Sequence, residues 1–284
     1  MSVALENLRQ DLRSRLESDQ MMSAAWIIVP LFEIIAVIVF IILIVVLVID
    51  YIIRLQLQGG PLPTTNPFLA PEFFALVRAF SYVEFVLGLF FAYMLFKLIK
   101  RRNTHFARQS YVYEDMTTVA KEVAAKKGTD VTLSLNNIQR ALREARSEET
   151  EKNAVLWVIL TLAGSIAALG GGTGAGGALL PGLATLYIFY FLNKDFFNHE
   201  RREDAYFEEM NRMMMTLGVA TTLPRRSYPT PSRGFVLYIV LTIVTIGFFW
   251  VYWTYTLLND PNNHFRQQSM AEDTFIMQVT PLLA

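Results

Sequence analysis

The sequence predicts an all-α integral membrane protein with about five transmembrane helices, arranged as three divergent repeats of a spanning helix followed by a surface helix. The first observation behind this prediction is composition. Of 284 residues, 53% are hydrophobic and 18% are charged, against roughly 25% charged residues in soluble domains. The apolar residues also come in long uncharged runs, some of them long enough to cross a bilayer. The sequence therefore favours a membrane protein.

The second observation is an internal repeat without a gap. The first copy contains Gly88, Tyr93 and His105, and the same residue types return twice more at the same spacing. The corresponding residues are Gly182, Tyr187 and His199 in the second copy, and Gly247, Tyr252 and His264 in the third. The chain has 3 histidines, and all of them fall at one repeat position. Self-similarity of this kind indicates that one structural unit is used several times.

Composition also excludes several functions. The formal net charge is zero, so the chain carries no general attraction for nucleic acid. There are no cysteines, which excludes disulfides, thiolate metal sites and cysteine nucleophiles. No Ser–His–Asp, HExxH or paired-carboxylate arrangement stands out at a usable spacing. We therefore expect a protein that is not an enzyme and that carries no cofactor.

The first part of the chain predicts a surface helix and a membrane hairpin. Residues 1–24 place leucines at helical spacing between mixed charges, which is typical of an amphipathic helix at a membrane surface. Residues 25–102 contain two apolar runs, 25–53 and 72–99, joined by a loop rich in Pro and Gly. A basic cluster, Lys97–Arg102, ends the second run. By the positive-inside rule this cluster is cytoplasmic, so we expect a multi-pass protein of the cell membrane with a cytoplasmic N-terminus.

The remainder of the chain divides into four further segments. Residues 103–153 predict a cytoplasmic helical hairpin, and residues 154–194 predict a second membrane hairpin around a Gly-rich turn. Residues 195–234 predict a surface helix and a linker. The last segment, 235–284, predicts a fifth span over 235–258 and a C-terminal surface helix.

The fifth span creates a conflict in topology. Five spans with a cytoplasmic N-terminus place His105 and His199 in the cytoplasm but His264 outside. Matching repeat copies more naturally share one side of the membrane, which favours an alternative, a re-entrant hairpin centred on Gly247. Residues 235–258 suffice for one crossing and are too few for two. Five spans are therefore the preferred prediction, and the side of the C-terminus stays open.

The three histidines raise the hypothesis of a shared metal site on a pseudo-threefold axis, because imidazole is a common metal ligand. In the preferred interpretation, each histidine instead marks the exit of its helix from the bilayer and hydrogen-bonds a neighbouring helix. Carboxylates also recur in the repeat, but on the opposite helix face, where they cannot pair within their own copy. They are Glu114, Glu208 and Asp273. His105, His199 and His264 thus remain candidate ligands, while the expectation is that no metal binds.

Glu33, Arg78 and Glu84 are ionisable residues inside the apolar runs, and charge is costly in a bilayer, so they are functional candidates. At helical rise, Glu33 lies about 10 Å and Glu84 about 20 Å from the cytoplasmic end, which argues against a carboxylate pair. A proton or cation pathway is one interpretation. Pairing of Glu84 with Arg78, a buried polar neighbour or a subunit interface are the others. The tyrosines before each helix exit are typical of a membrane interface.

The third copy reads Thr245-Ile-Gly247-Phe-Phe-Trp-Val-Tyr252-Trp253-Thr-Tyr255, followed by Asn259-Asp260. This stretch resembles a family of small prokaryotic multi-pass membrane proteins of unknown function, which carries a T-x-G-aromatic-x-x-x-Y-W-x-Y core. The resemblance covers the C-terminal repeat and weakens in the other copies. It implies a prokaryotic membrane and supplies no activity.

These features together predict a non-enzymatic membrane scaffold, or an accessory subunit of a membrane protein complex, that acts through helix packing and surface helices. The expected partners are the lipid bilayer and a protein partner or second copy of the chain, bound through the surface helices. No nucleic acid is expected. The Met-rich stretch 212–215 suits adaptable contacts. The alternative is an ion or proton channel or transporter that uses the intramembrane carboxylates Glu33 and Glu84.

Overall fold

The computed structural model describes residues 2–57, 68, 71–169, 175–219 and 223–283, and these ranges contain helices and no strand. The N-terminal elements are α1 (Val3–Arg13), α2 (Arg15–Ser18), the 3₁₀ helix η1 (Ala24–Ile27) and α3 (Ile28–Leu57). The remaining helices are α4 (Pro71–Lys127), α5 (Thr132–Glu148), α6 (Ala154–Leu169), α7 (Ala175–Thr216), α8 (Phe235–Val244) and α9 (Phe248–Leu283).

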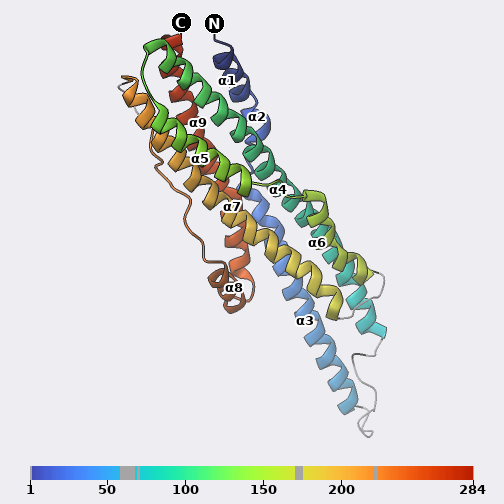
Figure 1. Ribbon diagram of the computed structural model, residues 1–284. Helices are drawn as coiled ribbons and strands as arrows, with labels where there is room; N and C mark the ends of the chain where they lie inside the picture. The colour runs from blue at the N-terminus through green and yellow to red at the C-terminus, as the bar shows by residue number, and fades with distance from the viewer. Residues whose placement is uncertain (1, 58–67, 69–70, 170–174, 220–222, 284) are drawn as a thin grey trace.

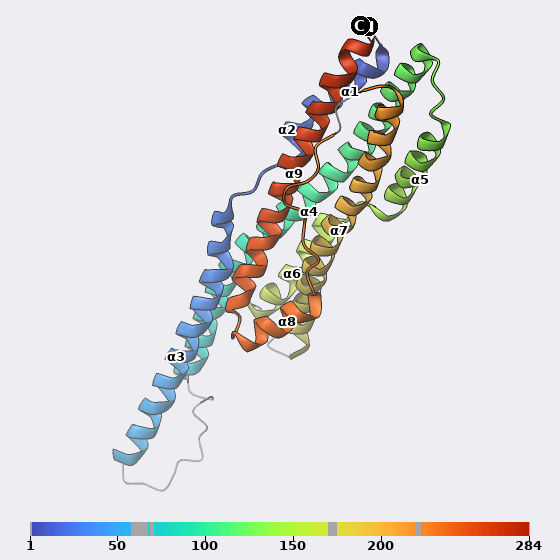
Figure 2. The same cartoon turned by 90° about the vertical axis from the view of Figure 1, so that its left-hand side faces the viewer.

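Three long helices, α4, α7 and α9, run side by side in the same direction along an elongated bundle (Figures 1 and 2). Each of them contains one copy of the repeat, so the apolar segment and the polar segment of a copy form a single helix. The prediction of a separate C-terminal surface helix after residue 258 is wrong, because α9 continues through Pro261 to Leu283. Asp260 accepts hydrogen bonds from Arg233 at 2.7 and 2.9 Å.

Glycine ends two of the long helices. Gly128 follows α4 with a φ of +63°, and the sequence-based prediction that this helix stops there is confirmed. Gly218 follows α7 with a φ of +72°. Glycine has no Cβ and adopts this left-handed conformation without strain, which is why helices commonly end in this way.

The prediction that residues 235–258 form one continuous span is wrong. The helix breaks after Val244, where Ile246 and Gly247 have φ values of +51° and +90°, and α9 starts at Phe248. The ring of Tyr238 in α8 lies 4.9 Å from that of Phe249, so α8 folds back on the start of α9. The chain therefore reverses at Gly247, which was the alternative that the repeat favoured.

The core of the bundle is built from equivalent positions of the repeat. Met94, Ile188 and Trp253, six residues after the repeat glycines, are fully buried in one cluster between α4, α7 and α9. A second cluster occupies the other end of the bundle, where α1, α5 and the ends of the long helices meet (Figure 1). Two methionines of the 212–215 stretch, Met213 and Met214, belong to this core, so they are not the exposed contact surface that the sequence suggested.

Two helical stretches are long and apolar enough to cross a membrane, Ala24–Arg54 and the helix Pro71–Lys127. Shorter apolar helices cover Ala154–Gly164 and Phe235–Val244. The sequence predicted five spanning helices, whereas two helices in the described ranges are long and apolar enough to cross a membrane. Large apolar side chains of α3, such as Ile41 and Val46, are exposed along much of that helix.

Candidate metal centre

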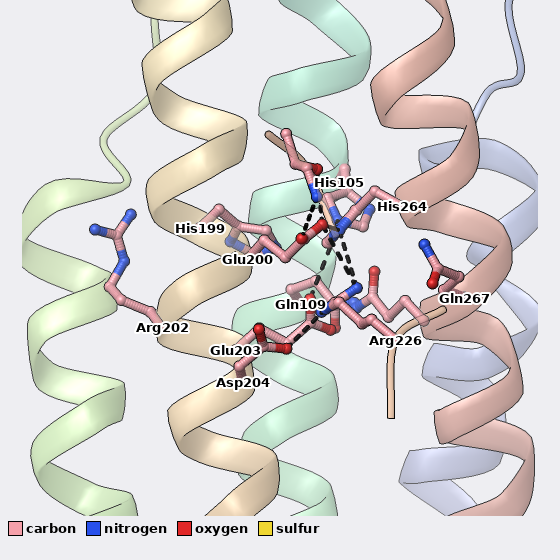
Figure 3. A network of polar contacts seen from close by, with 12 residues as sticks. His105, Gln109, His199, Glu200, Arg202, Glu203, Asp204, Arg226, His264 and Gln267 are labelled. Carbon is pink, nitrogen blue, oxygen red and sulfur yellow. Dashed lines mark hydrogen bonds and ion pairs between the residues drawn. The ribbon is translucent and has the colours of Figure 1, made fainter. Parts of the chain in front are cut away.

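The three histidines meet in the interior of the bundle. His105 of α4, His199 of α7 and His264 of α9 each offer one ring nitrogen, and these nitrogens lie within 4.8 Å of one another. The rings are 0–2% exposed, and Figure 3 shows them approaching from three helices. The prediction that His264 lies on the other side of the membrane from His105 and His199 is therefore wrong. Because α4, α7 and α9 are parallel, the same repeat position comes to the same level in each helix.

A carboxylate orients each imidazole ring through its Nδ1 atom. His105 Nδ1 lies 2.8 Å from Asp19, His199 Nδ1 lies 2.9 Å from Glu149, and His264 Nδ1 lies 3.2 Å from Glu200. In metal sites, a ligating histidine commonly donates its second ring N–H to a carboxylate, which fixes the tautomer and directs the other nitrogen to the ion. All three histidines have a carboxylate at Nδ1, and His264 Nδ1 also lies 3.3 Å from Arg226 Nη1.

The Nε2 atoms of the rings then face one another. His105 Nε2 and His264 Nε2 are 3.1 Å apart, and His199 Nε2 is buried with no hydrogen-bond partner among the described residues. When each Nδ1–H donates to its carboxylate, each Nε2 carries a lone pair and no proton. Two lone pairs 3.1 Å apart repel each other, so either one ring carries its proton on Nε2 and donates it to the other ring, or a cation lies between the two nitrogens. The geometry suits a cation bound to the three Nε2 atoms.

Burial keeps the rings of His105 and His264 neutral, as metal binding requires. Burial lowers the pKa of His105 to about 3, although the hydrogen bond to Asp19 acts in the opposite direction. Burial likewise lowers the pKa of His264. Burial by itself would raise the pKa of Asp19, but His105 and Arg108 outweigh it and lower that pKa below its ordinary value. At neutral pH the centre thus combines the neutral imidazoles of His105 and His264 with the ionised carboxylate of Asp19.

Arginines hold the carboxylates around the rings. Arg108 donates to Asp19 at 2.8 Å and to Glu272 at 3.0 Å. Arg226 forms ion pairs with Glu203 and Asp204 and lies 3.8 Å from Glu200 (Figure 3). A buried charge is stable only when it is paired and hydrogen-bonded, so this network positions the carboxylates rigidly.

The repeated carboxylates lie outside this centre, as the sequence predicted. Glu114 pairs with Arg146, Glu208 pairs with Arg212, and Asp273 pairs with Arg15. The carboxylates that do contact the rings were missed by the sequence analysis. Asp19 and Glu149 lie in connecting segments, and Glu200 has no acidic counterpart beside His105 or His264. The only available signal for Glu200 was its position next to His199.

Glu33 and Glu84 line one cavity of about 400 Å³ in the apolar half of the molecule, with Gly88, Gly182 and Trp250. The prediction that their different depths keep the two carboxylates apart is therefore wrong, since α3 and α4 pack so that both side chains face the same space. Arg78 is exposed and forms no ion pair with Glu84 in the described part of the chain. Tyr93, Tyr187 and Tyr252 are 43–52% exposed on the outer faces of their helices, where interfacial tyrosines are expected.

No protein-family model matches the chain, and no curated protein and no solved structure matches it.

Proposed function

We propose that this chain is a membrane-anchored metal-binding protein, which holds one divalent transition-metal ion on His105, His199 and His264. The observation that carries the proposal is the convergence of three buried imidazoles whose Nδ1 atoms are all engaged by carboxylates. A tetrahedral ion about 2.1 Å from each nitrogen needs nitrogens about 3.4 Å apart. The separation of 3.1 Å between two of the Nε2 atoms is close to that value.

The donor set indicates the class of metal. Three imidazoles suit Zn²⁺, Fe²⁺, Ni²⁺ or Cu²⁺, whereas Mg²⁺ and Ca²⁺ prefer oxygen ligands. Zn²⁺ is the first ion to test because a site of three histidines is a known arrangement for it. The ion would join α4, α7 and α9, so it would also stabilise the packing of the three repeat copies.

We further propose that the apolar half of the molecule lies in the cell membrane. Residues 25–53 and 72–99 would cross it, and α6, the first half of α7 and the α8–α9 hairpin would pack beside them in the same layer. The exposed apolar side chains of these segments support this placement, for example Ile159 and Ile243. Lys97 and Lys100 next to this half favour a cytoplasmic location for the metal centre and both termini.

Within this framework, a non-enzymatic scaffold or accessory subunit remains our proposal for the biological role. Its supporting feature is the rigid, charged bundle that α1, α5 and the ends of α7 and α9 build beyond the membrane. A scaffold predicts a partner that stays bound through purification in mild detergent. The alternative, an ion or proton transporter, gains one supporting observation, which is the cavity shared by Glu33 and Glu84. A transporter predicts a flux in proteoliposomes that Glu84→Gln abolishes.

Elemental analysis of the purified full chain tests the metal proposal. The chain should carry a histidine-free purification tag, because its own histidines are the ligands. We expect about one transition-metal ion per chain, or one after dialysis against Zn²⁺, and loss of that ion in His105→Gln, His199→Gln and His264→Gln. Arg266→Gln, an exposed position on α9, is the matched control and should keep the ion. A folded wild-type chain that takes up none of these metals would refute the proposal.

A further inference from the structure

A second ring of polar side chains lies one helical turn beyond the histidines. Gln109, Glu203 and Gln268 each follow a histidine by four residues, so they occupy equivalent positions in the three repeat copies. Four residues correspond to about 6 Å of helical rise. All three side chains are buried, with exposed fractions of 1%, 2% and 1%. The repeat therefore places three oxygen-bearing side chains beside the metal centre.

Each member of this ring has one oxygen without a partner. The Oε1 atoms of Gln109, Glu203 and Gln268 are buried without a hydrogen-bond partner among the described residues, although the Tyr113 hydroxyl also interacts with the Glu203 carboxylate. The other polar atoms of these side chains are engaged. Gln109 Nε2 donates to Glu272 at 3.1 Å, Gln268 Nε2 donates to the Tyr113 hydroxyl at 3.4 Å, and Glu203 Oε2 pairs with Arg226. A buried acceptor left without a hydrogen bond destabilises a protein, so this ring is suited to a ligand that supplies hydrogen-bond donors.

A cavity borders two of the three ring members, Gln109 and Glu203. It has a volume of about 390 Å³, within the usual range for small-molecule sites, and it lies between α4, α5 and α7. His199, Gln109 and Glu203 form part of its wall, and Phe106, Leu142 and Tyr206 form an apolar part. The cavity thus borders the candidate metal centre at His199, and a molecule in it can place an apolar body against α5.

The contacts of Glu203 favour a metal ion with three protein ligands and a free coordination position over an ion with four protein ligands. Structural zinc sites have four protein ligands, whereas sites that bind an exogenous ligand have three. Glu203 Oε2 lies 3.7 Å from His264 Nε2, and it is already held in an ion pair by Arg226. Arg226 engages one oxygen of the Glu203 carboxylate, Oε2, and leaves Oε1 without a hydrogen bond from the described residues. This free oxygen is placed to accept a hydrogen bond from a metal-bound group.

We propose that the ion on the three histidines keeps a coordination position open towards this cavity, and that a small protic oxygen-donor ligand with an apolar body binds there. The ligand's oxygen would bond to the metal. Its O–H or N–H groups would donate to Gln109 and Glu203, and its apolar body would lie against Phe106 and Leu142. This inference rests on the proposed metal centre and adds the class of ligand that the centre takes.

The test uses the full chain in detergent, loaded with Co²⁺, whose visible absorption reports its coordination. Benzohydroxamate is the probe, because it has two metal-binding oxygens, one N–H donor and an apolar ring. Acetohydroxamate has the same metal-binding group without the ring. We expect both probes to change the Co²⁺ spectrum in a saturable way. Filling the cavity with Ala141→Phe should weaken benzohydroxamate binding at least about tenfold and acetohydroxamate binding less, with Co²⁺ affinity within about twofold of wild type.

Ala205→Phe, on an exposed face of α7, is the matched control and should bind both probes like the wild type. If Ala141→Phe fails to load Co²⁺, the smaller change Ala145→Leu at another cavity residue replaces it. Co²⁺ that binds but shows no response to either probe would mean a closed centre, and would overturn this inference while leaving the proposed metal site intact. Equal weakening by the Ala141 and Ala205 variants would also overturn it. Failure of the wild type to bind Co²⁺ would overturn both proposals.

Discussion

The carboxylate behind His105 gives the sharpest test of how the metal centre is built. Asp19 lies in the connection between α2 and η1, where one oxygen contacts His105 Nδ1 at 2.8 Å and the other accepts from Arg108 at 2.8 Å. Asp19→Asn keeps the shape of the side chain and removes its charge. Arg108 retains its ion pair with Glu272 at 3.0 Å, so we expect the variant to fold.

The expected loss of affinity follows from the role of the carboxylate. Removing the partner of a metal-bound histidine costs about 10- to 100-fold in metal affinity. That range corresponds to about 1.4–2.8 kcal/mol. At a Zn²⁺ concentration 100 times the wild-type Kd, the ion stabilises the wild type by about 2.7 kcal/mol, and a variant with thirtyfold weaker binding gains only about 0.9 kcal/mol. The gain in unfolding free energy upon Zn²⁺ addition should therefore differ by about 1.8 kcal/mol between the two proteins.

The measurement is a competition titration of Zn²⁺ against a fluorescent chelator, together with unfolding of both proteins with and without the ion. Glu17→Gln is the control, because Glu17 is an exposed carboxylate in the same short segment. It should leave Zn²⁺ affinity within about twofold of wild type. The reasoning fails if Asp19→Asn folds like the wild type and also binds Zn²⁺ as tightly.

Three further predictions concern topology, the α8–α9 turn and metal removal. Single cysteines at Ser110 and Ser269 should both resist a membrane-impermeant thiol reagent in intact cells and both react after lysis; labelling of position 269 alone in intact cells would contradict the shared side. Gly247→Ala should destabilise the fold by about 1 kcal/mol, because alanine is strained at the positive φ of this position. The new Cβ would lie 3.8 Å from Ile34, an ordinary contact, so no clash adds to this cost. The helical control Gly182→Ala, whose Cβ would meet nothing within 4 Å, should be neutral or stabilising in the same denaturation assay, and equal losses would argue against the strained turn. A chelator should lower the unfolding midpoint of the wild type but not that of a variant without histidines, and equal shifts would indicate a non-specific effect.

The repeat carried more structural information than the hydropathy pattern did. Hydropathy over 235–258 counts enough apolar residues for one crossing, and it contains no signal for the direction in which the chain travels. Direction is decided by the backbone at Ile246 and Gly247, whose positive φ values reverse the chain. The repeat required His264 to be equivalent to His105, and equivalence in parallel helices brings the rings together. The hypothesis of a shared site was available from the sequence, but the choice between one crossing and a hairpin was not.

The environment of the rings could not be predicted from the repeat for a different reason. Asp19, Glu149 and Glu200 do not occupy one repeat position, because two of them belong to connections and one belongs to α7. Their contacts depend on how the connections pack against the bundle. The same limitation affected Glu33 and Glu84, whose depths were counted separately along each helix. Packing of α3 against α4 decides that both reach one cavity.

The metal centre also connects the two halves of the molecule. Each carboxylate that orients a ring is linked to a segment leading into the apolar half. Asp19 precedes η1 and α3, Glu149 lies between α5 and α6, and Glu200 accepts hydrogen bonds from the backbone and hydroxyl of Thr230, at 2.6 and 2.7 Å, in the segment before α8. An ion on the three Nε2 atoms would fix the rings so that their Nδ1–H groups hold these carboxylates in place. On our proposal, metal binding at one point would therefore order all three connections, because the carboxylates come from different segments although the histidines come from one repeat.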